Sequence, residues 1–375
     1  MKKINKILVA ILMVLAVGGC NNSKNSCECP NDNNDENKVE TTLINGYSKQ
    51  YQETAQSVVM VEMRRLANNE LRSTGSGVVF FEEGKSAYII TNAHVLKDYT
   101  SSGYIVEVYF SDNKGVQTGK SEKATVAGVD YYEDVAVLEI DKSDKYKVAK
   151  LGDSNAISKS EGIYTIGSPL QIFNHTTDGV ISNYNYEIAI DMINSGKKTN
   201  VYAILTDAPI NNGNSGGGLF NSKGELIGIT TFKYNTENKM AESLVDQNTS
   251  LTDVYGSLPI NHVVKVAKHL LSSTEAYKRP NLSGLTLLSV NTMGSDRTTH
   301  EISSNIFTGV YVKHSTEASI PYQTIITKIN GVTVNSKEEF MVQVLEYNIG
   351  DTVTLTLINS KDGMNEQTVN VTLHE

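Results

Sequence analysis

Ser215 has the residue type and the local setting of a nucleophile. It lies on the glycine-flanked turn Asn-Ser-Gly-Gly, directly after a run expected to form a strand. A serine hydroxyl attacks a carbonyl carbon poorly at its own pKa. It therefore needs an adjacent base, and fixed N–H donors for the charge that develops on the carbonyl oxygen. Because Gly, Asn and Ser are also common turn residues, this stretch alone also fits an ordinary loop.

His94 and Asp134 are the base and the carboxylate that such a serine requires. His94 follows the apolar run 87–90, at the expected end of a strand, and Asp134 opens the alternating run 134–140. Each alone has a simpler explanation, since most histidines lie on the surface or in a satisfied core and an aspartate before a strand usually forms a turn. All three contexts, in the order His, Asp, Ser, favour a catalytic triad.

The three motifs resemble those of chymotrypsin-fold serine proteases of the HtrA (Deg) type. The resemblance covers residues 56–271 and is carried by TNAHV around His94, DVAVLEI from Asp134, and TDAPINNGNSGG ending at Gly217. It implies that Ser215 is the nucleophile and that His94 is first general base and then general acid. It also implies that Asp134 holds the histidine tautomer and stabilises the imidazolium.

The same resemblance implies an oxyanion hole built from the backbone N–H groups of Gly213 and Ser215, with Asn214 shaping the loop. Two positions depart from the family pattern, which usually has proline after GNSGG and before Gly-Asn-Ser. This chain has Gly218 and Asn212 there. Because both residues restrict the backbone less than proline does, we expect a loop that needs ordering before it acts.

Pro209 is the sequence feature that bears on substrate choice. In this fold the residue six before the nucleophile lies at the base of the primary specificity pocket, and here it is Pro209 and not an acid. We therefore expect cleavage after small or medium apolar residues and not after Lys or Arg. The polar insertion 235–253 falls near this pocket and is either a sensing loop or lid, or a plain surface loop.

Short β-branched runs separated by turn signals predict a mostly β fold with two six-stranded antiparallel barrels of the chymotrypsin type. The first set is 57–63, 77–81, 87–91, 104–110, 124–130 and 135–140, and the second is 162–167, 177–183, 201–207, 217–220, 226–232 and 256–259. A helix capped by Asn261 would close a serine protease domain over residues 46–272.

Residues 280–375 resemble a PDZ domain, a small α+β fold. Its carboxylate-binding loop would be Leu282, Ser283, Gly284 and Leu285. PDZ domains bind C-terminal peptides by adding them as a strand to an exposed sheet edge. The segment 313–323 is shorter than usual and lacks the expected Gly-Asp, so a packing or spacing role is the alternative.

Residues 1–19 predict a lipoprotein signal peptide. Three lysines precede an apolar run of eleven residues, which is too short to span a bilayer. The run ends in Val-Gly-Gly-Cys, which resembles a lipobox and implies acylation of Cys20. Residues 20–45 are polar enough to form a disordered tether. We therefore expect an exported protein that is lipid-anchored to the outer face of the cytoplasmic membrane or to the cell envelope.

Cysteine content and charge narrow the remaining function classes. Cys27 and Cys29 lie in the tether, where two thiols are too few for a closed zinc site, and no cysteine follows them. Neither a metal nor another cofactor is expected, and the cores must hold without disulfides. Removal of residues 1–19 changes the formal charge from −9 to −12, which disfavours nucleic acid as a partner.

The leading hypothesis is a membrane-tethered, ATP-independent serine endopeptidase that cleaves unfolded or exposed polypeptides for envelope protein quality control. One alternative is a regulatory sensor protease that makes a defined cut in a membrane partner. A second is a non-catalytic peptide-binding chaperone or adaptor. The resemblance further implies a homotrimer, with Tyr47 and Tyr51 as candidate contacts near the start of the protease domain.

Overall fold

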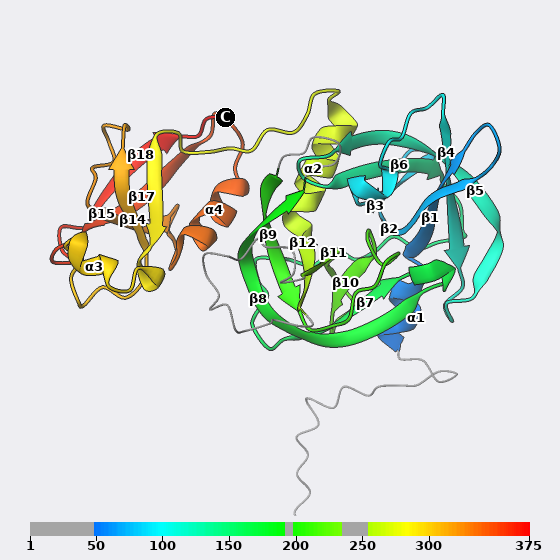
Figure 1. The fold of residues 1–375 in the computed structure, drawn as a ribbon, viewed down its shortest axis with the longest axis horizontal. Coiled ribbons are helices and arrows are strands. Elements are labelled where there is room, and N and C mark those ends of the chain that lie inside the picture. Colours follow the sequence, from blue (N-terminus) through cyan, green and yellow to red (C-terminus); the bar gives the residue numbers. More distant parts are fainter. Residues whose placement is uncertain (1–48, 192–197, 235–253) are drawn as a thin grey trace, which may run out of the picture. The chain divides into compact units, whose positions relative to one another are not determined.

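The computed structural model describes residues 49–191, 198–234 and 254–375 (Figure 1). The predicted signal peptide, the tether with its three cysteines, Tyr47 and the insertion 235–253 lie outside these ranges. Within the described ranges, no helix has the length and apolar character needed to cross a membrane.

The first barrel is closed and follows a short helix, α1 (Lys49–Ala55). Its strands are β1 (Val58–Arg65), β2 (Leu71–Glu83), β3 (Ser86–Thr91), β4 (Tyr104–Ser111), β5 (Gln117–Asp130) and β6 (Val135–Asp141). They pair antiparallel in the order β1-β2-β3-β6-β5-β4 (Figure 1). Val61, Ile89 and Leu138 are fully buried in its core, as expected for the inward positions of alternating strands.

The second barrel is also closed, which confirms the prediction of two six-stranded barrels. Its strands are β7 (Gly162–Gly167), β8 (His175–Asp191), β9 (Lys198–Thr206), β10 (Gly218–Asn221), β11 (Leu226–Tyr234) and β12 (Val254–Pro259). They pair antiparallel in the order β10-β11-β12-β9-β8-β7.

Strand β8 is much longer than the predicted run 177–183. Its register shifts between Ile181 and Tyr186, and Asn185 has a left-handed φ of 55°. Such a bulge bends a strand without ending its pairing. The polar residues after position 183 therefore do not end the strand, and β8 continues to pair with β9.

Helix α2 (Ile260–Ser272) joins the two barrels through one buried face. Val263, Val266 and Ala267 belong to a single apolar cluster that also holds Val78 of the first barrel and Phe220 of the second. A helix that is apolar on one face lowers its free energy by burying that face, so α2 fixes the barrels to each other.

The prediction that Asn261 caps α2 is wrong. The helix begins at Ile260, two residues before the start that an Asn261 cap would give, and its N-cap position is Pro259, which makes no side-chain capping bond. Asn261 instead bonds to the loop before β7: its Nδ2 donates to Asp153 Oδ1 (2.8 Å) and its Oδ1 accepts from Ser154 N (3.2 Å).

The C-terminal domain is an antiparallel sheet packed against a helix. Its elements are β13 (Leu285–Ser289), α3 (Asp296–Thr299), β14 (Val310–Ser315), β15 (Thr324–Ile329), β16 (Val332–Thr333), α4 (Lys337–Leu345), β17 (Thr352–Asn359) and β18 (Gln367–Thr372). The sheet order is β13-β14-β15-β17-β18, with β16 paired to β15, so β13 is an edge strand. Ser336 caps α4 by accepting a hydrogen bond from Glu339 N, and the Glu339 carboxylate accepts from Asn335 N at 2.8 Å.

Candidate active site

The three predicted triad residues come from both barrels. His94 lies in the 3₁₀ helix Ala93–Leu96 directly after β3, and Asp134 ends the turn between β5 and β6. Ser215 lies on the loop between β9 and β10. Strand ends and connecting loops therefore bring together residues that are far apart in the sequence, as is common for sites built on a rigid barrel scaffold.

His94 and Asp134 form a two-point contact. His94 Nδ1 lies 2.8 Å from Asp134 Oδ2, and the backbone N–H of His94 donates to Asp134 Oδ1 at 2.9 Å. Asp134 is only 4% exposed, and Asn92 Nδ2 donates to its carbonyl at 3.0 Å. A carboxylate held in this way fixes the imidazole with its proton on Nδ1, which leaves Nε2 free to accept a proton.

Asp134 also sets the basicity of the histidine. Burial of the His94 ring lowers its pKa, but the charge of Asp134 and the hydrogen bond to it outweigh burial. The pKa of His94 is therefore raised above its ordinary value. A ring with a raised pKa accepts a proton more strongly, as a general base requires.

Ser215 does not hydrogen-bond to His94 in this conformation. Its Oγ donates to the carbonyl of Thr231 at 3.2 Å, and no bond links it to His94 within the part of the chain that the structure describes. Bonds between base and nucleophile are often long or unformed without substrate. For chemistry the serine side chain must turn from Thr231 towards Nε2.

The Ser215 loop carries the two backbone N–H groups that are predicted to form the oxyanion hole. Gly213 and Gly216 have φ values of 102° and 87°, which favour glycine strongly. Among the described residues, neither the Gly213 N–H nor the Ser215 N–H donates to a protein acceptor. Their role as oxyanion donors stays a prediction.

Gly213 and Asn214 are tightly packed against the segment that follows β7. A Cβ on Gly213 would lie 2.7 Å from the Cα of Pro169, in the 3₁₀ helix Pro169–Gln171 after β7. Asn214 is 1% exposed, and its side-chain atoms have no hydrogen-bond partner among the residues that the structure describes. Instead it packs against Gly167, where a Cβ would come within 2.7 Å of Asn214 Oδ1.

The two departures from the family pattern have different settings. Asn212 is exposed, whereas Gly218 is buried at the start of β10. A Cβ on Gly218 would lie 2.4 Å from the Phe220 ring. The Phe220 ring thus occupies the space of a side chain at position 218, and this contact offsets part of the backbone freedom that glycine brings.

The loop is anchored on the first barrel by residues that sequence reasoning missed. Ser76 N donates to the carbonyl of Ser215 at 2.8 Å, and Ser76 Oγ donates to the carbonyl of Gly213 at 2.7 Å. Thr91 Oγ1 donates in turn to the Ser76 carbonyl at 2.6 Å. The only sequence feature that indicated a role for either residue was the position of Thr91 in the TNAHV motif. Nothing in the sequence around Ser76 predicts its contacts with the loop.

Pro209 is exposed, and its carbonyl accepts from Thr177 Oγ1 at 2.9 Å. The nearby acid, Asp207, accepts from the backbone of Val180 at 2.7 Å. Its carboxylate is thereby engaged with β8. The role of Pro209 in substrate choice stays a prediction.

The residues that the structure describes contain no candidate set of metal ligands. No three His, Cys, Asp or Glu side chains there gather closely enough to hold an ion.

Two closed barrels with a histidine–aspartate pair on one and a glycine-flanked serine on the other define a trypsin-like serine peptidase. Residues 75–229 match the trypsin-like peptidase domain. The Do-like serine protease HtrA of Lactococcus lactis subsp. cremoris (strain MG1363) is 33% identical over 296 residues, which are 76% of this chain and 68% of that protein. The chain therefore belongs to the HtrA family of serine proteases and is a serine endopeptidase.

Other relatives agree. The Do-like serine protease HtrB of Bacillus subtilis (strain 168) is 33% identical over 311 residues, which cover 80% of this chain and 61% of that protein. Among solved structures, the HtrA-type protease AlgW with a tripeptide matches with a TM-score of 0.56 at 21% identity, over 87% of this chain and 95% of that chain. At this identity the likeness is one of fold.

Gly213→Ala should lower kcat by about 10²–10³, the effect of losing one oxyanion donor. The new methyl group meets both a left-handed φ and the Pro169 backbone, so the loop must move. Steady-state kinetics with a peptide substrate measure the change. Gly162→Ala is the matched control, because a Cβ there has no heavy atom within 4 Å. Wild-type kcat in Gly213→Ala would contradict this account of the loop.

Asp134→Asn should lower kcat by about 10⁴, because an amide supports the wrong histidine tautomer. It should also move the acid limb of the pH–rate profile to lower pH. His94 must be neutral to act as base, and the pKa of His94 is raised by the charge that this variant removes. A pH series of kcat/KM measures both effects. An unmoved acid limb would show that the profile reports a different group.

Proposed function

We propose that this protein is a membrane-tethered, ATP-independent serine endopeptidase that cleaves unfolded or exposed polypeptides after small or medium apolar residues. The observation that carries the proposal is the pairing of His94 with a buried Asp134 beside a Ser215 loop whose two N–H donors have no protein acceptor. A dead adaptor has no need of this arrangement. Envelope protein quality control is the role that fits such a substrate class.

The proposed reaction proceeds through an acyl-enzyme. Ser215 Oγ attacks the scissile carbonyl carbon while its proton passes to His94 Nε2, and the N–H groups of Gly213 and Ser215 bind the oxyanion. His94 then gives that proton to the leaving amine as the C–N bond breaks. Water, deprotonated by His94, attacks the ester, and the proton returns to Ser215 as the acid product leaves. Asp134 stabilises the imidazolium in both halves.

We further propose that the C-terminal domain is PDZ-like and binds C-terminal peptides. A groove of about 320 Å³ lies along the edge strand β13 and is lined by Leu282, Leu285 and Leu287, with Met341 of α4 opposite. Gly284 has a φ of 78°, and its carbonyl accepts from Thr316 N, so Ser283 and Gly284 form a tight turn at the end of the groove. An edge strand beside a groove with three leucines and a methionine suits strand addition.

One observation favours the sensor protease as the second candidate function. Glu187 of β8 and Tyr202 of β9 line the same groove, and Lys337 Nζ of α4 lies 2.8 Å from Glu187 Oε2. A peptide in this groove would therefore touch the second barrel as well as the C-terminal domain. Peptide binding and protease activity can be coupled through such a shared surface.

Fluorophosphonate labelling tests the endopeptidase. We expect labelling of the wild-type protein and none of Ser215→Ala, and cleavage of unfolded casein and of peptides with Ala or Val before the scissile bond. Labelling that needs an added C-terminal peptide would favour the sensor protease. Equal labelling of the two proteins would contradict the assignment of Ser215 as nucleophile. A preference for Lys or Arg before the scissile bond would contradict the proposed specificity.

The tether and the oligomer remain proposals. Cys20→Ala should move the protein from the membrane fraction to the soluble fraction, because acyl chains contribute about 0.8 kcal/mol per buried CH₂. Fractionation of cells expressing each form, with Cys27→Ala as the control, measures this. Equal membrane association of the Cys20 variant would contradict the proposed lipid anchor.

For the proposed homotrimer, one candidate contact, Tyr51, packs within its own chain and donates to the Asn174 carbonyl at 3.3 Å.

A further inference from the structure

Glu133 is a buried carboxylate that the proposed triad does not use. It directly precedes Asp134 and is 2% exposed. Its Oε2 lies 2.7 Å from His262 Nε2, and Arg279 donates to both its oxygens, from Nε at 2.6 Å and from Nη2 at 2.7 Å. Burial would raise its pKa, but the charges and hydrogen bonds of His262 and Arg279 lower it to about 2. Glu133 is therefore a fixed anion.

Stability alone is a poor reason for this cluster. Taking a carboxylate and a guanidinium out of water costs several kcal/mol for each ion, and well-packed apolar residues often replace such pairs without loss. What a bidentate Arg–carboxylate pair adds is a defined geometry. The cluster is therefore better explained by what it positions.

A second carboxylate, that of Asp130, lies at the start of the turn that leads to Asp134. It is held by the same chain segment as Glu133, the one between α2 and β13. Asp130 Oδ1 accepts from Tyr132 N at 2.8 Å and from Glu133 N at 3.0 Å, which closes the turn. Its Oδ2 accepts from Tyr277 N at 3.0 Å. Tyr277 and Arg279 both belong to the segment between α2 and β13, so that segment contacts both ends of the turn before Asp134.

Asp134 needs such support because its backbone is left-handed, with a φ of 53°. An aspartate adopts this conformation at a modest energetic cost, and surrounding contacts must maintain it. Asn92 and His94 hold Asp134 from the side of the site. Asp130 and the Glu133 cluster hold the residues directly before it.

We infer that Arg279, through Glu133, positions Asp134 for the triad, so that the segment joining the protease and C-terminal domains controls the rate of the reaction. The inference rests on the proposed function of the triad. Arg279 is a positioning residue, since the hydrogen bonds found for it among the described residues go to Glu133 and Asn200 and not to the triad. Arg279 Nη1 also donates to the Asn200 carbonyl of β9, so one side chain connects the turn of the first barrel to the second barrel.

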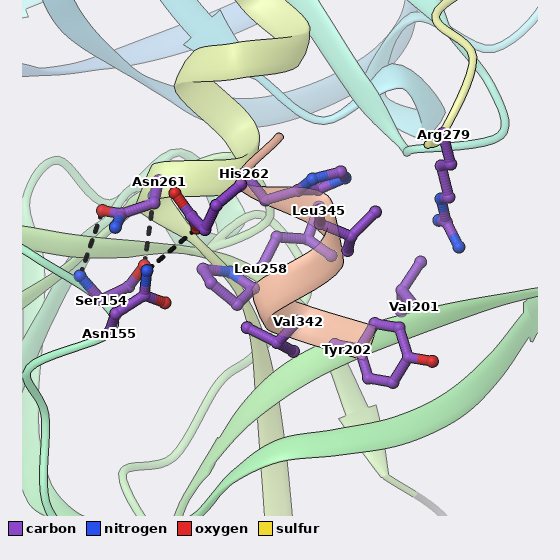
Figure 2. A pocket seen from close by; sticks show the side chains of 12 residues that line it. Ser154, Asn155, Val201, Tyr202, Leu258, Asn261, His262, Arg279, Val342 and Leu345 are labelled. Carbon is purple, nitrogen blue, oxygen red and sulfur yellow. Dashed lines mark hydrogen bonds between the residues drawn. The ribbon is translucent and has the colours of Figure 1, made fainter. Parts of the chain in front are cut away.

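The C-terminal domain lies beside this cluster. His262 and Arg279 line a small pocket whose wall also includes Val342 and Leu345 of α4 (Figure 2). Lys265, three residues after His262 on α2, donates to the Leu345 carbonyl at 2.6 Å. A shift of α4 would therefore disturb the two groups that hold Glu133, which is a route to the aspartate separate from the Ser215 loop.

Kinetics of Arg279→Ala in the full chain test the inference. We expect kcat to fall about 10²-fold, because an Å-scale misplacement of a catalytic group has that effect, with KM changed less than about two-fold. The acid limb of the pH–rate profile should move to lower pH as Asp134 leaves His94. Arg279→Lys should be intermediate, because one ammonium cannot reproduce the bidentate contact.

Three further variants separate positioning from general damage. Lys278→Ala makes the same charge change one residue away, where the ammonium pairs with exposed Glu375, and should keep wild-type kcat. Glu133→Gln should reproduce the loss of Arg279→Ala. In an Asp134→Asn background, Arg279→Ala should have no further effect on the fluorophosphonate labelling rate, since both act on one element.

Two outcomes overturn the inference: wild-type kcat and an unmoved acid limb in Arg279→Ala, or additive losses in the Asp134→Asn background. If Arg279→Ala unfolds at the assay temperature, Arg279→Lys and Glu133→Gln decide by the same two measurements. Wild-type protein and Ser215→Ala run in parallel. No difference between those two would count against the proposed function, whereas a difference together with a fully active Arg279→Ala would remove only the positioning role.

Discussion

The site depends on the contact between the Ser215 loop and strand β2 of the first barrel. Ser76 donates to the carbonyls of both Gly213 and Ser215, and a Cβ on Gly216 would lie 2.1 Å from the Ser76 carbonyl. The loop belongs to the second barrel, but its shape is determined against the first. Because His94 and Asp134 sit on that same barrel, one set of short contacts fixes the nucleophile relative to its base.

This contact is maintained because the two barrels are held in a fixed relative position. Helix α2 packs on both barrels through Val263, Val266 and Ala267, so their relative position is fixed by a shared apolar core and not by the site itself. Apolar burial is strong but non-directional. The directional part comes from buried hydrogen bonds at the rim, where Asn92 donates to both the Asp134 carbonyl and Thr231 Oγ1. Together they hold a catalytic geometry that neither would specify alone.

The structure separates two ways of controlling such a site. One acts on the Ser215 loop, where the serine hydroxyl bonds to Thr231 and must turn before it reaches His94. The other acts on the turn of Asp134, which is held by Glu133, His262 and Arg279. The turn of Asp134 lies next to the segment that leads to the C-terminal domain. The chemistry of the triad and the placement of that domain are therefore physically connected.

The triad residues and the fold class could be predicted from the sequence, because short motifs and alternating β-branched residues are local features. Alternating β-branched runs indicated two barrels, and His94, Asp134 and Ser215 each lie in a short motif. Only the tertiary structure decided the length of β8, the partner of the Ser215 hydroxyl and the start of α2. It alone brought Glu133 to Arg279, which is 146 residues away. A hydrogen bond over such a separation depends on how strands and helices pack, and no local pattern of residues encodes it.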